Sequence, residues 1–462
     1  MTVQLRQVVI PFYIFVCLLV GGSSRAPWSN MALQLGAVAI LGWAVLARPR
    51  FKAGRPGTQL AAMLFVMVAL IGLQLVPLPP AVWSALPARD AVAHGFDLLR
   101  TPLPWLPLSM SPYDTLNSAL WLLPPFAVLA GVLRLGAYRE TWIALAIVLA
   151  ALAGVILGAL QLAGNGDAAS NWYIYSNTNE GSAVGFFANA NHMAILLVAT
   201  VPFIFALVEA KTSRTLTRKV HASAGKAVIL GGTLMVILVG IILNRSLAGY
   251  ALGAFALIAS VFILLHLEDT RARWGLVVVG LGGLLATAVI VASPAQNNLT
   301  AAGVETDYSS RYTSFTNSLR AVADHFPVGS GLGTFADVYP AYENPTWVDR
   351  WYVNHVHNDY IEIALETGLP GIILMAAFLL WWLQRAVAVW RAPEINQLAR
   401  AATIASGAIM LHSLVDFPLR TTAIASLFAF CVAIMVGMRR RPKIEASIEK
   451  GAGGARHLSI AY

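Results

Sequence analysis

The chain is dominated by uninterrupted apolar runs of about 20 residues, the length that one α-helix needs to cross a bilayer. Such runs recur along most of its 462 residues, of which 58% are hydrophobic and only 11% are charged. A soluble domain is roughly a quarter charged, and the mean hydropathy here is +0.69. The sequence therefore predicts an all-α polytopic membrane protein.

We expect about twelve transmembrane helices. They cover residues 8–22, 31–47, 60–76, 117–135, 141–163, 186–208, 226–243, 247–265, 274–292, 359–383, 398–415 and 420–438. A second interpretation of the first run is a signal peptide, because Arg6 precedes it and GGSSRA follows it. Whether residues 1–22 are retained therefore stays open at this point.

The distribution of Lys and Arg predicts the orientation of these helices. If alternate loops are assigned to the cytoplasm from the N-terminus onward, 23 of the 31 basic residues fall on that side. Cytoplasmic loops carry such an excess in membrane proteins. We therefore predict a protein with both termini inside the cell, in a multi-pass arrangement.

Two of the outer loops are unusually long, which favours a functional role. The first, at 77–116, is rich in Pro, and the sequence gives no fold for it. The second, at 293–358 before the tenth span, mixes aromatic, Gly, Arg and His residues, so we expect a folded periplasmic cap with short helices. The chain then divides into N-terminal spans at 1–163, a core at 164–438 that includes this cap, and a basic cytoplasmic tail at 439–462.

Two other classes of function are disfavoured. The net charge of +9 comes from short basic runs between apolar segments, not from one basic patch, so we expect no nucleic acid partner. The two cysteines, Cys17 and Cys431, each lie inside an apolar run. They form neither a disulfide framework nor a thiolate metal site.

The segment HVHNDYIEIALETGLPG, residues 355–371, places two His, one Asp and two Glu at the start of an apolar helix. Ionisable groups at membrane depth are costly unless they are paired or hydrated, and so they indicate function. Helical spacing puts Asp359, Glu362 and Glu366 on one face, where outer Arg residues could pair with them. His357 would then lie at the boundary of cap and membrane, and histidine can accept a proton near neutral pH.

These polar motifs also have other interpretations. His-x-His followed by carboxylates could bind zinc, but the spacing is not HExxH and nearby Arg residues disfavour a cation. The motif PVGSGLGTF at 327–335 lacks the Lys of a phosphate-binding P-loop, so a Gly-rich turn is the better interpretation. Arg245, in the short turn LNRSLAG, could simply reach lipid head groups.

Together, fixed cations, a candidate base and aromatic surfaces on one side of the bilayer favour transfer from a phosphorylated lipid. Arg binds phosphate bidentately and stays charged. Because nucleotide-activated donors are not expected outside the cytoplasm, the donor must carry its own leaving group, and a polyprenyl diphosphate fits. His357 would deprotonate an acceptor hydroxyl, and the cations would stabilise the departing diphosphate. Such a single displacement inverts the anomeric centre and needs no metal or cofactor.

Several motifs resemble the O-antigen ligase / polysaccharide polymerase superfamily of bacterial inner-membrane glycosyltransferases. Its signature is His, then Asn, Ser or Gln, nine residues, Gly, two residues and Gly, which His357-Asn358 and Gly368-Leu369-Pro370-Gly371 match. Further matches are GFFANANH at 185–192, NRSLAG at 244–249, SSRYTSF at 309–315, HFPVGSGLGTF at 325–335 and SLVDFPLR at 413–420. The resemblance covers about 185–420 and implies about twelve helices with a periplasmic cap.

The resemblance also implies roles for single residues. His357 takes the place of the essential His, and Arg245 and Arg311 take the places of two diphosphate-binding Arg. Many relatives have NRNH where this chain has Ala190 in NANH, so donor recognition differs there or another group serves. As supporting residues we name His355 (a second candidate base), Asn358, Asp359, Glu366, Asn191, His192, Arg320 and Arg420.

The resulting hypothesis is transfer of a glycan from an undecaprenyl-diphosphate carrier on the periplasmic face of the bacterial inner membrane. The enzyme would be a metal-independent inverting glycosyltransferase in assembly of lipopolysaccharide (O-antigen) or exopolysaccharide, and membrane lipid surrounds it. The acceptor is a glycan, as for a polymerase, or lipid A–core, as for a ligase. Alternatives are a protein O-oligosaccharyltransferase of the same superfamily and a transporter or flippase for the lipid-linked glycan. Sugar identity, linkage and oligomeric state are not encoded in these motifs.

Overall fold

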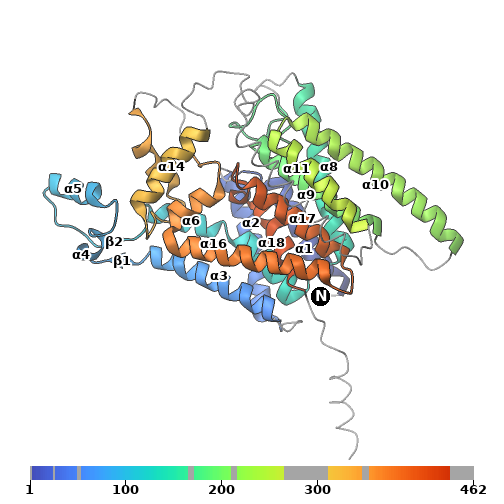
Figure 1. Ribbon diagram of the computed structural model, residues 1–462, viewed down its shortest axis with the longest axis horizontal. Coiled ribbons are helices and arrows are strands. Elements are labelled where there is room, and N and C mark those ends of the chain that lie inside the picture. The colour runs from blue at the N-terminus through green and yellow to red at the C-terminus, as the bar shows by residue number, and fades with distance from the viewer. Residues whose placement is uncertain are drawn as a thin grey trace, which may run out of the picture.

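The computed structural model describes residues 3–23, 26–48, 54–164, 171–209, 216–264, 311–345 and 353–437. Outside these described residues lie the predicted span at 274–292, part of the predicted cap and the predicted basic tail. The described chain is almost entirely helical, as the apolar runs predict (Figure 1).

The elements up to residue 163 include one small β-ladder. They are α1 (Val3–Val20), α2 (Pro27–Leu46), α3 (Arg55–Gln74), β1 (Pro77–Leu78), α4 (Pro80–Trp83), α5 (Asp90–Leu98), β2 (Leu106–Pro107), α6 (Pro112–Leu120), α7 (Leu123–Ala130), the π-helix η1 (Gly131–Leu135) and α8 (Glu140–Ala163).

The later elements contain the signature. They are α9 (Ala190–Glu209), α10 (Leu216–Asn244), α11 (Leu247–Leu264), α14 (Arg311–His325), α15 (Phe335–Val338), η3 (Tyr339–Tyr342), α16 (Asp359–Arg391), α17 (Gln397–His412), η5 (Pro418–Arg420) and α18 (Thr422–Met435).

Each predicted span within the described residues coincides with one helix, except that the span at 117–135 is divided among α6, α7 and η1. Seven of the described helices are long and apolar enough to cross a membrane, and α1, α10 and α18 contain shorter apolar stretches. The prediction that the apolar runs form α-helices is thus confirmed for the described residues. The total of twelve spans and their orientation stay predictions.

Helix α9 forms the centre of the bundle. Its most apolar stretch is 83% buried, compared with 17% for α3 at the periphery. Around α9 pack α8, α10, α11 and α17, and α18 joins this layer to α1 and α7. The outer face of α3 is apolar and exposed, as a surface in contact with lipid requires. The early helices therefore pack directly on the core helices.

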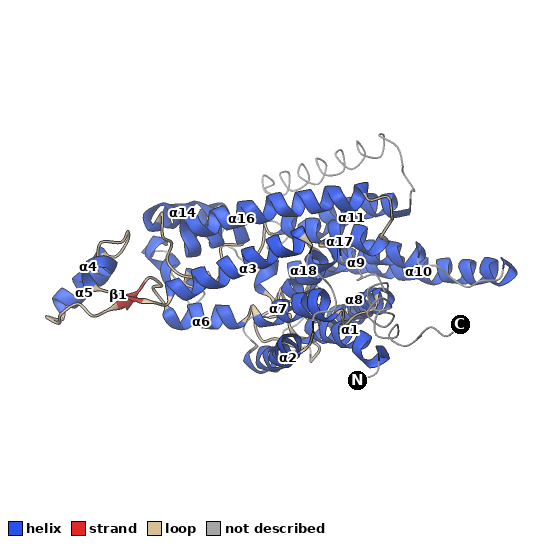
Figure 2. Ribbon diagram, turned by 90° about the horizontal axis from the view of Figure 1, so that it is seen from below, coloured by secondary structure: helices blue, strands red, loops and turns tan. Residues whose placement is uncertain are grey.

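The Pro-rich loop at 77–116, whose fold could not be predicted, is an ordered arm. Its strands β1 and β2 pair antiparallel. Trp83 is fully buried within the arm, lies edge-on to Phe96 and donates its indole N–H to the carbonyl of Pro104 at 2.8 Å. Figure 2 shows α4, α5 and α14 at one end of the molecule and the free end of α10 at the other.

The described part of the predicted cap contains short helices, as expected. Helix α14, α15 and η3 surround a small core of their own, which includes Phe335 and Tyr339. This core also takes in Val356 and Leu365, so it rests directly on the first turns of α16. The cap residues thereby lie against the segment that contains His355 and His357. Their periplasmic location stays a prediction.

Candidate active site

The chain enters α16 through a tight backbone turn. His357 has φ +57°, a left-handed conformation that is uncommon for a residue with a side chain. Asn358 is the N-cap of α16, and its side-chain oxygen accepts from the backbone N–H of Tyr360 and Ile361. Its amide nitrogen donates to the carbonyl of Leu414. The His-Asn pair of the signature therefore begins a helix and ties that beginning to the segment before α18.

His357 is paired with a carboxylate that lies 59 positions later in the chain. Its Nδ1 is 3.1 Å from Oδ1 of Asp416. The Asp416 side chain is fully buried, whereas the His357 side chain is 33% exposed. Because Nδ1–H donates to the carboxylate, Nε2 of the neutral ring is the proton acceptor. This is the geometry of an oriented general base.

A second histidine–carboxylate pair lies beside the first. Nδ1 of His355 is 2.8 Å from Oε1 of Glu362, and the other oxygen of Glu362 accepts the backbone N–H of Val356 at 3.1 Å. The His355 and His357 rings lie 4.3 Å and 4.9 Å from the ring centroid of Phe417. His192, at the start of α9, contacts the same phenyl ring at 5.0 Å. Phe417 thus contacts three imidazole rings, two from the residues just before α16 and one from the start of α9.

The three acidic residues on one face of α16 converge on Arg420. Its guanidinium lies 3.7 Å from Asp359, 3.5 Å from Glu362 and 2.8 Å from Glu366. The contact with Glu366 is bidentate, with a second hydrogen bond at 3.3 Å. The pairing that helical spacing predicts for these carboxylates is therefore present, and Arg420 is occupied by it.

The charge on Arg420 follows from this environment. Three carboxylates surround the guanidinium, and an Arg side chain beside them stays protonated. A buried cation with several carboxylates fixes their positions, because leaving any one of them unpaired is costly. Arg420 thus holds the carboxylate that orients His355.

The signature glycines are explained by a close approach of two backbones. Gly368 has φ +58° and ψ −151°, which kinks α16, and a Cβ there would lie 2.7 Å from the backbone nitrogen of Gly329. Across this contact, Leu369 N–H donates to the carbonyl of Pro327, and Ser330 N–H donates to that of Leu365. The Gly-rich segment from Pro327 is thus a turn docked on α16, as predicted.

The arm joins the same junction through Gln74, the last residue of α3. Its amide nitrogen donates to the carbonyl of Glu366 at 2.9 Å, and its oxygen accepts the N–H of Leu332 at 3.0 Å. Met110 N–H donates to the carbonyl of Ser330. The arm, the Gly-rich turn and α16 therefore form one connected structure.

The NANH and NRS motifs meet at the ends of α9 and α10. Ser246 Oγ donates to Oδ1 of Asn191 at 2.7 Å, and the amide of Asn244 donates to the carbonyls of Ala183 and Ala190 at 2.8 Å. Arg245, between them, is exposed and has φ +61°. No acidic side chain within the described residues forms an ion pair with it.

Contacts link this turn to the His357 pair. Ala248, the second residue of α11, packs on Val415, the neighbour of Asp416. Asn191 precedes His192, whose ring contacts Phe417. Arg245, Asn191, His192 and His357 therefore belong to the same end of the bundle. Arg311 is the first residue of α14, and its side chain lies outside the described part, while Arg320 is exposed on α14.

Two residues of this site were not singled out from the sequence. Asp416 and Phe417 lie in the motif SLVDFPLR at 413–420, for which the sequence indicated no role for either residue. A signal was present: Asp416 is the only acidic residue between Glu394 and Glu445, in an otherwise apolar region. A lone carboxylate at membrane depth indicates a buried partner, and here that partner is His357.

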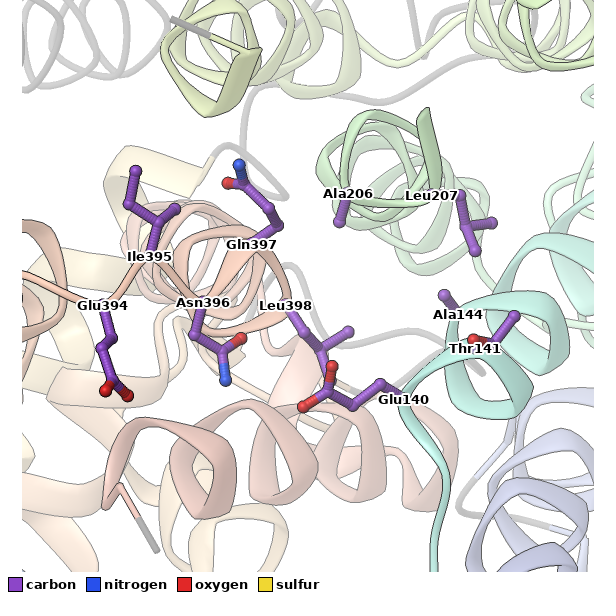
Figure 3. A pocket seen from close by; sticks show the side chains of 10 residues that line it. All are labelled: Glu140, Thr141, Ala144, Ala206, Leu207, Glu394, Ile395, Asn396, Gln397 and Leu398. Atoms are coloured by element: carbon purple, nitrogen blue, oxygen red, sulfur yellow. The ribbon is translucent and has the colours of Figure 1, made fainter. Parts of the chain in front are cut away.

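A pocket of about 420 Å³ lies at the other end of the bundle (Figure 3). It is lined by the start of α8, the end of α9 and the connection from α16 to α17, including Glu140, Leu207 and Asn396. Because α9 begins at the His192 end and reaches the pocket only at Leu207, the pocket is separate from the histidine site. Among the described residues, no three His, Cys, Asp or Glu are grouped as metal ligands.

The chain matches one protein-family model, described as O-antigen ligase, over residues 232–376. This range begins within α10 and ends within α16, and it includes Arg245, Arg311 and His357. Asp416 and Arg420 follow it in the chain. No curated protein matches the chain significantly.

Proposed function

We propose, from the match of residues 232–376 to the O-antigen ligase family model, that the chain is a member of the O-antigen ligase/polymerase superfamily and transfers a glycan from a polyprenyl-diphosphate carrier to an acceptor hydroxyl. The observation that carries the proposal is the pair of His357 and buried Asp416 at the start of α16. The pair provides a base that is partly exposed, oriented and held by secondary structure.

In the proposed reaction, Nε2 of His357 removes the proton of the acceptor hydroxyl. Asp416 holds the ring in the tautomer that accepts at Nε2, and it stabilises the imidazolium that forms. The hydroxyl oxygen attacks the anomeric carbon, and the diphosphate leaves from the opposite side. The product therefore has the inverted configuration.

The departing diphosphate is assigned to Arg245 and Arg311. Arg245 suits this role because it is exposed at the site end of the bundle and free of ion pairs with the described residues. Arg420 does not suit it, since three carboxylates already occupy its guanidinium. Because Arg supplies permanent charge with bidentate geometry, no metal is required.

The setting of the reaction is part of the proposal. We place the enzyme in the bacterial inner membrane with the histidine site on the periplasmic face, where undecaprenyl diphosphate carries the glycan. The acceptor is the end of another carrier-linked glycan or lipid A–core. The His357 pair would serve either hydroxyl, and a serine or threonine hydroxyl of a protein as well, so an acceptor screen separates these outcomes.

The direct test is transfer of a labelled glycan by the purified, reconstituted protein. Wild-type protein should convert an undecaprenyl-diphosphate glycan to product with one of the candidate acceptors when these are offered in turn, and EDTA should leave the rate unchanged. Failure with every acceptor would contradict the proposal. Inhibition by EDTA that zinc reverses would instead support a metal site.

The diphosphate role of Arg245 is tested by Arg245→Lys, which keeps the charge but loses the bidentate geometry. We expect a fall in kcat/KM of about tenfold or more, since a hydrogen bond to a charged group contributes roughly 1.5–3 kcal/mol. Arg100 is a matched control, because it is also exposed and has φ +54°. Arg100→Lys should leave the rate unchanged, and a wild-type rate for Arg245→Lys would exclude the assigned role.

A further inference from the structure

The mechanism proposed above uses one histidine–carboxylate pair, but the site contains two. His355 is linked to Glu362 at 2.8 Å, a shorter contact than that between His357 and Asp416. Glu362 is itself fixed by the backbone N–H of Val356 and by Arg420. A carboxylate held from two sides fixes the plane and tautomer of the imidazole that it contacts.

The second ring nitrogen of His355 is open. No described group forms a hydrogen bond with Nε2, and this atom is not among the fully buried polar atoms without a partner. The side chain as a whole is 13% exposed. His355 therefore presents Nε2 to an opening, as His357 does.

The two histidine rings contact the same phenyl ring, which sets an upper limit on their separation. The two imidazole centroids lie 4.3 Å and 4.9 Å from the Phe417 centroid, so they are no more than 9.2 Å apart. In inverting glycosidases the acid and the base are separated by roughly 6.5–9.5 Å, which leaves room for the attacking group and the anomeric carbon between them. The spacing of these two imidazoles is compatible with the same division of roles.

The charges around the two rings differ. The three carboxylates beside Arg420, which are Asp359, Glu362 and Glu366, share that one cation, and Glu362 also contacts His355 itself. A proton on His355 places a second cation beside Glu362. His357 faces the single carboxylate of Asp416, and its neutral form is the one that can act as base. This asymmetry suits an acid and a base side by side.

We propose that His355 is the general acid of the transfer and protonates the departing phosphate oxygen of the carrier. The acceptor oxygen forms its bond to the anomeric carbon and gives its proton to His357. The bond from that carbon to the phosphate oxygen breaks, its electron pair stays on that oxygen, and the proton on His355 Nε2 goes there. One ring gains a proton and the other loses one, so exchange with water restores both.

This inference rests on the proposed function, and the test separates the two. The experiment measures kcat and KM against pH for purified wild-type protein, His355→Gln and His357→Ala, with an undecaprenyl-diphosphate glycan. Gln keeps a hydrogen-bond donor but cannot give up a proton. Titratable groups that interact with His355 are Glu362, Glu366 and His192, while Arg420 contacts Glu362 and His357 shares the Phe417 ring. His355→Gln leaves all of these groups in place.

The expected result is a fall in kcat of about 10²-fold or more for His355→Gln, with KM little changed. Wild-type kcat should fall as the pH rises, because the acid loses its proton, and this alkaline fall should be absent in His355→Gln. His94, which is exposed on α5, provides the control variant His94→Gln, which should behave as wild type. If His355→Gln does not fold, His355→Asn provides the same comparison.

Two outcomes would overturn the inference alone. One is a wild-type rate in His355→Gln while His357→Ala is inactive. The other is a slow variant that retains the alkaline fall, which would indicate a structural role. If wild-type protein shows no transfer at all, the proposed function fails and this inference fails with it.

Discussion

At the scale of single residues, each of the two histidines has one ring nitrogen hydrogen-bonded to a carboxylate and one that is not. Nδ1 of His357 is hydrogen-bonded to Asp416, and Nδ1 of His355 is hydrogen-bonded to Glu362. In each ring Nε2 is therefore the nitrogen that can exchange a proton with a substrate. Neither carboxylate is exposed, which keeps water from competing for the imidazole. The partners lie seven and 59 positions away in the chain, so the two histidines depend on different parts of the fold.

We predict that Asp416→Asn lowers kcat by about 10²-fold or more with little change in KM. The amide can stabilise the wrong tautomer and cannot balance the charge of the imidazolium. Initial rates with the lipid-linked donor measure this. Asp97, exposed on α5, supplies the control Asp97→Asn. Wild-type kcat in Asp416→Asn would show that the ring needs no orienting carboxylate.

At the scale of elements, the junction of α16, the Gly-rich turn and the arm holds the site in place. His325, at the end of α14, connects these parts: its Nδ1 contacts the carbonyl of Ala321 at 2.9 Å, and its Nε2 contacts Met110 at 3.3 Å. Its carbonyl accepts the N–H of Gly329. Burial lowers the pKa of His325, a shift that the Ala321 carbonyl partly opposes and that Arg89 reinforces.

This shift predicts a pH dependence of stability. The unfolded chain binds a proton at His325 more readily than the folded chain does, so stability falls as the pH drops below the ordinary histidine range of about 6.5. His325→Gln should remove part of that loss. Unfolding temperatures in detergent at pH values from about 7.5 to about 5.5 measure it. Equal acid sensitivity in wild type and His325→Gln, with His94→Gln as reference, would contradict the prediction.

Local patterns predicted the elements well and the long-range pairs poorly. Apolar run length located the helices, and helical spacing placed Asp359, Glu362 and Glu366 on one face. Asp416 could not be matched to His357 in this way, because two segments 59 positions apart have no common period. The fold of the arm could not be predicted either. Its strands β1 and β2 are two residues each, too short to show a periodic pattern, and the chain between them is ordered by the buried Trp83.

At the scale of the whole molecule, the bundle has two distinct ends. One end has the histidine site, the arm and α14, and the other has the pocket between α8, α9 and the start of α17 (Figures 2 and 3). Basic residues lie near the pocket end of α16 and α17, such as Arg391 at the end of α16 and Arg400 in the first turn of α17. The proposed orientation therefore puts the pocket in the cytoplasm and the histidines outside.

Single introduced cysteines test this orientation, because native Cys17 and Cys431 are both buried. His94→Cys on the arm should react with a membrane-impermeant maleimide in spheroplasts. Glu394→Cys, beside the pocket, should react only after lysis. The reverse pattern would place the histidine site in the cytoplasm and contradict a periplasmic reaction.

The most direct measurement of the central claim is single-turnover transfer by His357→Ala, compared with wild type at equal protein and donor concentrations. An oriented general base contributes about 10²–10⁴-fold, so we predict a loss of that size, with normal abundance and membrane insertion. Transfer within about twofold of wild type would contradict the account, because a group that contributes nothing measurable to the barrier is not the base.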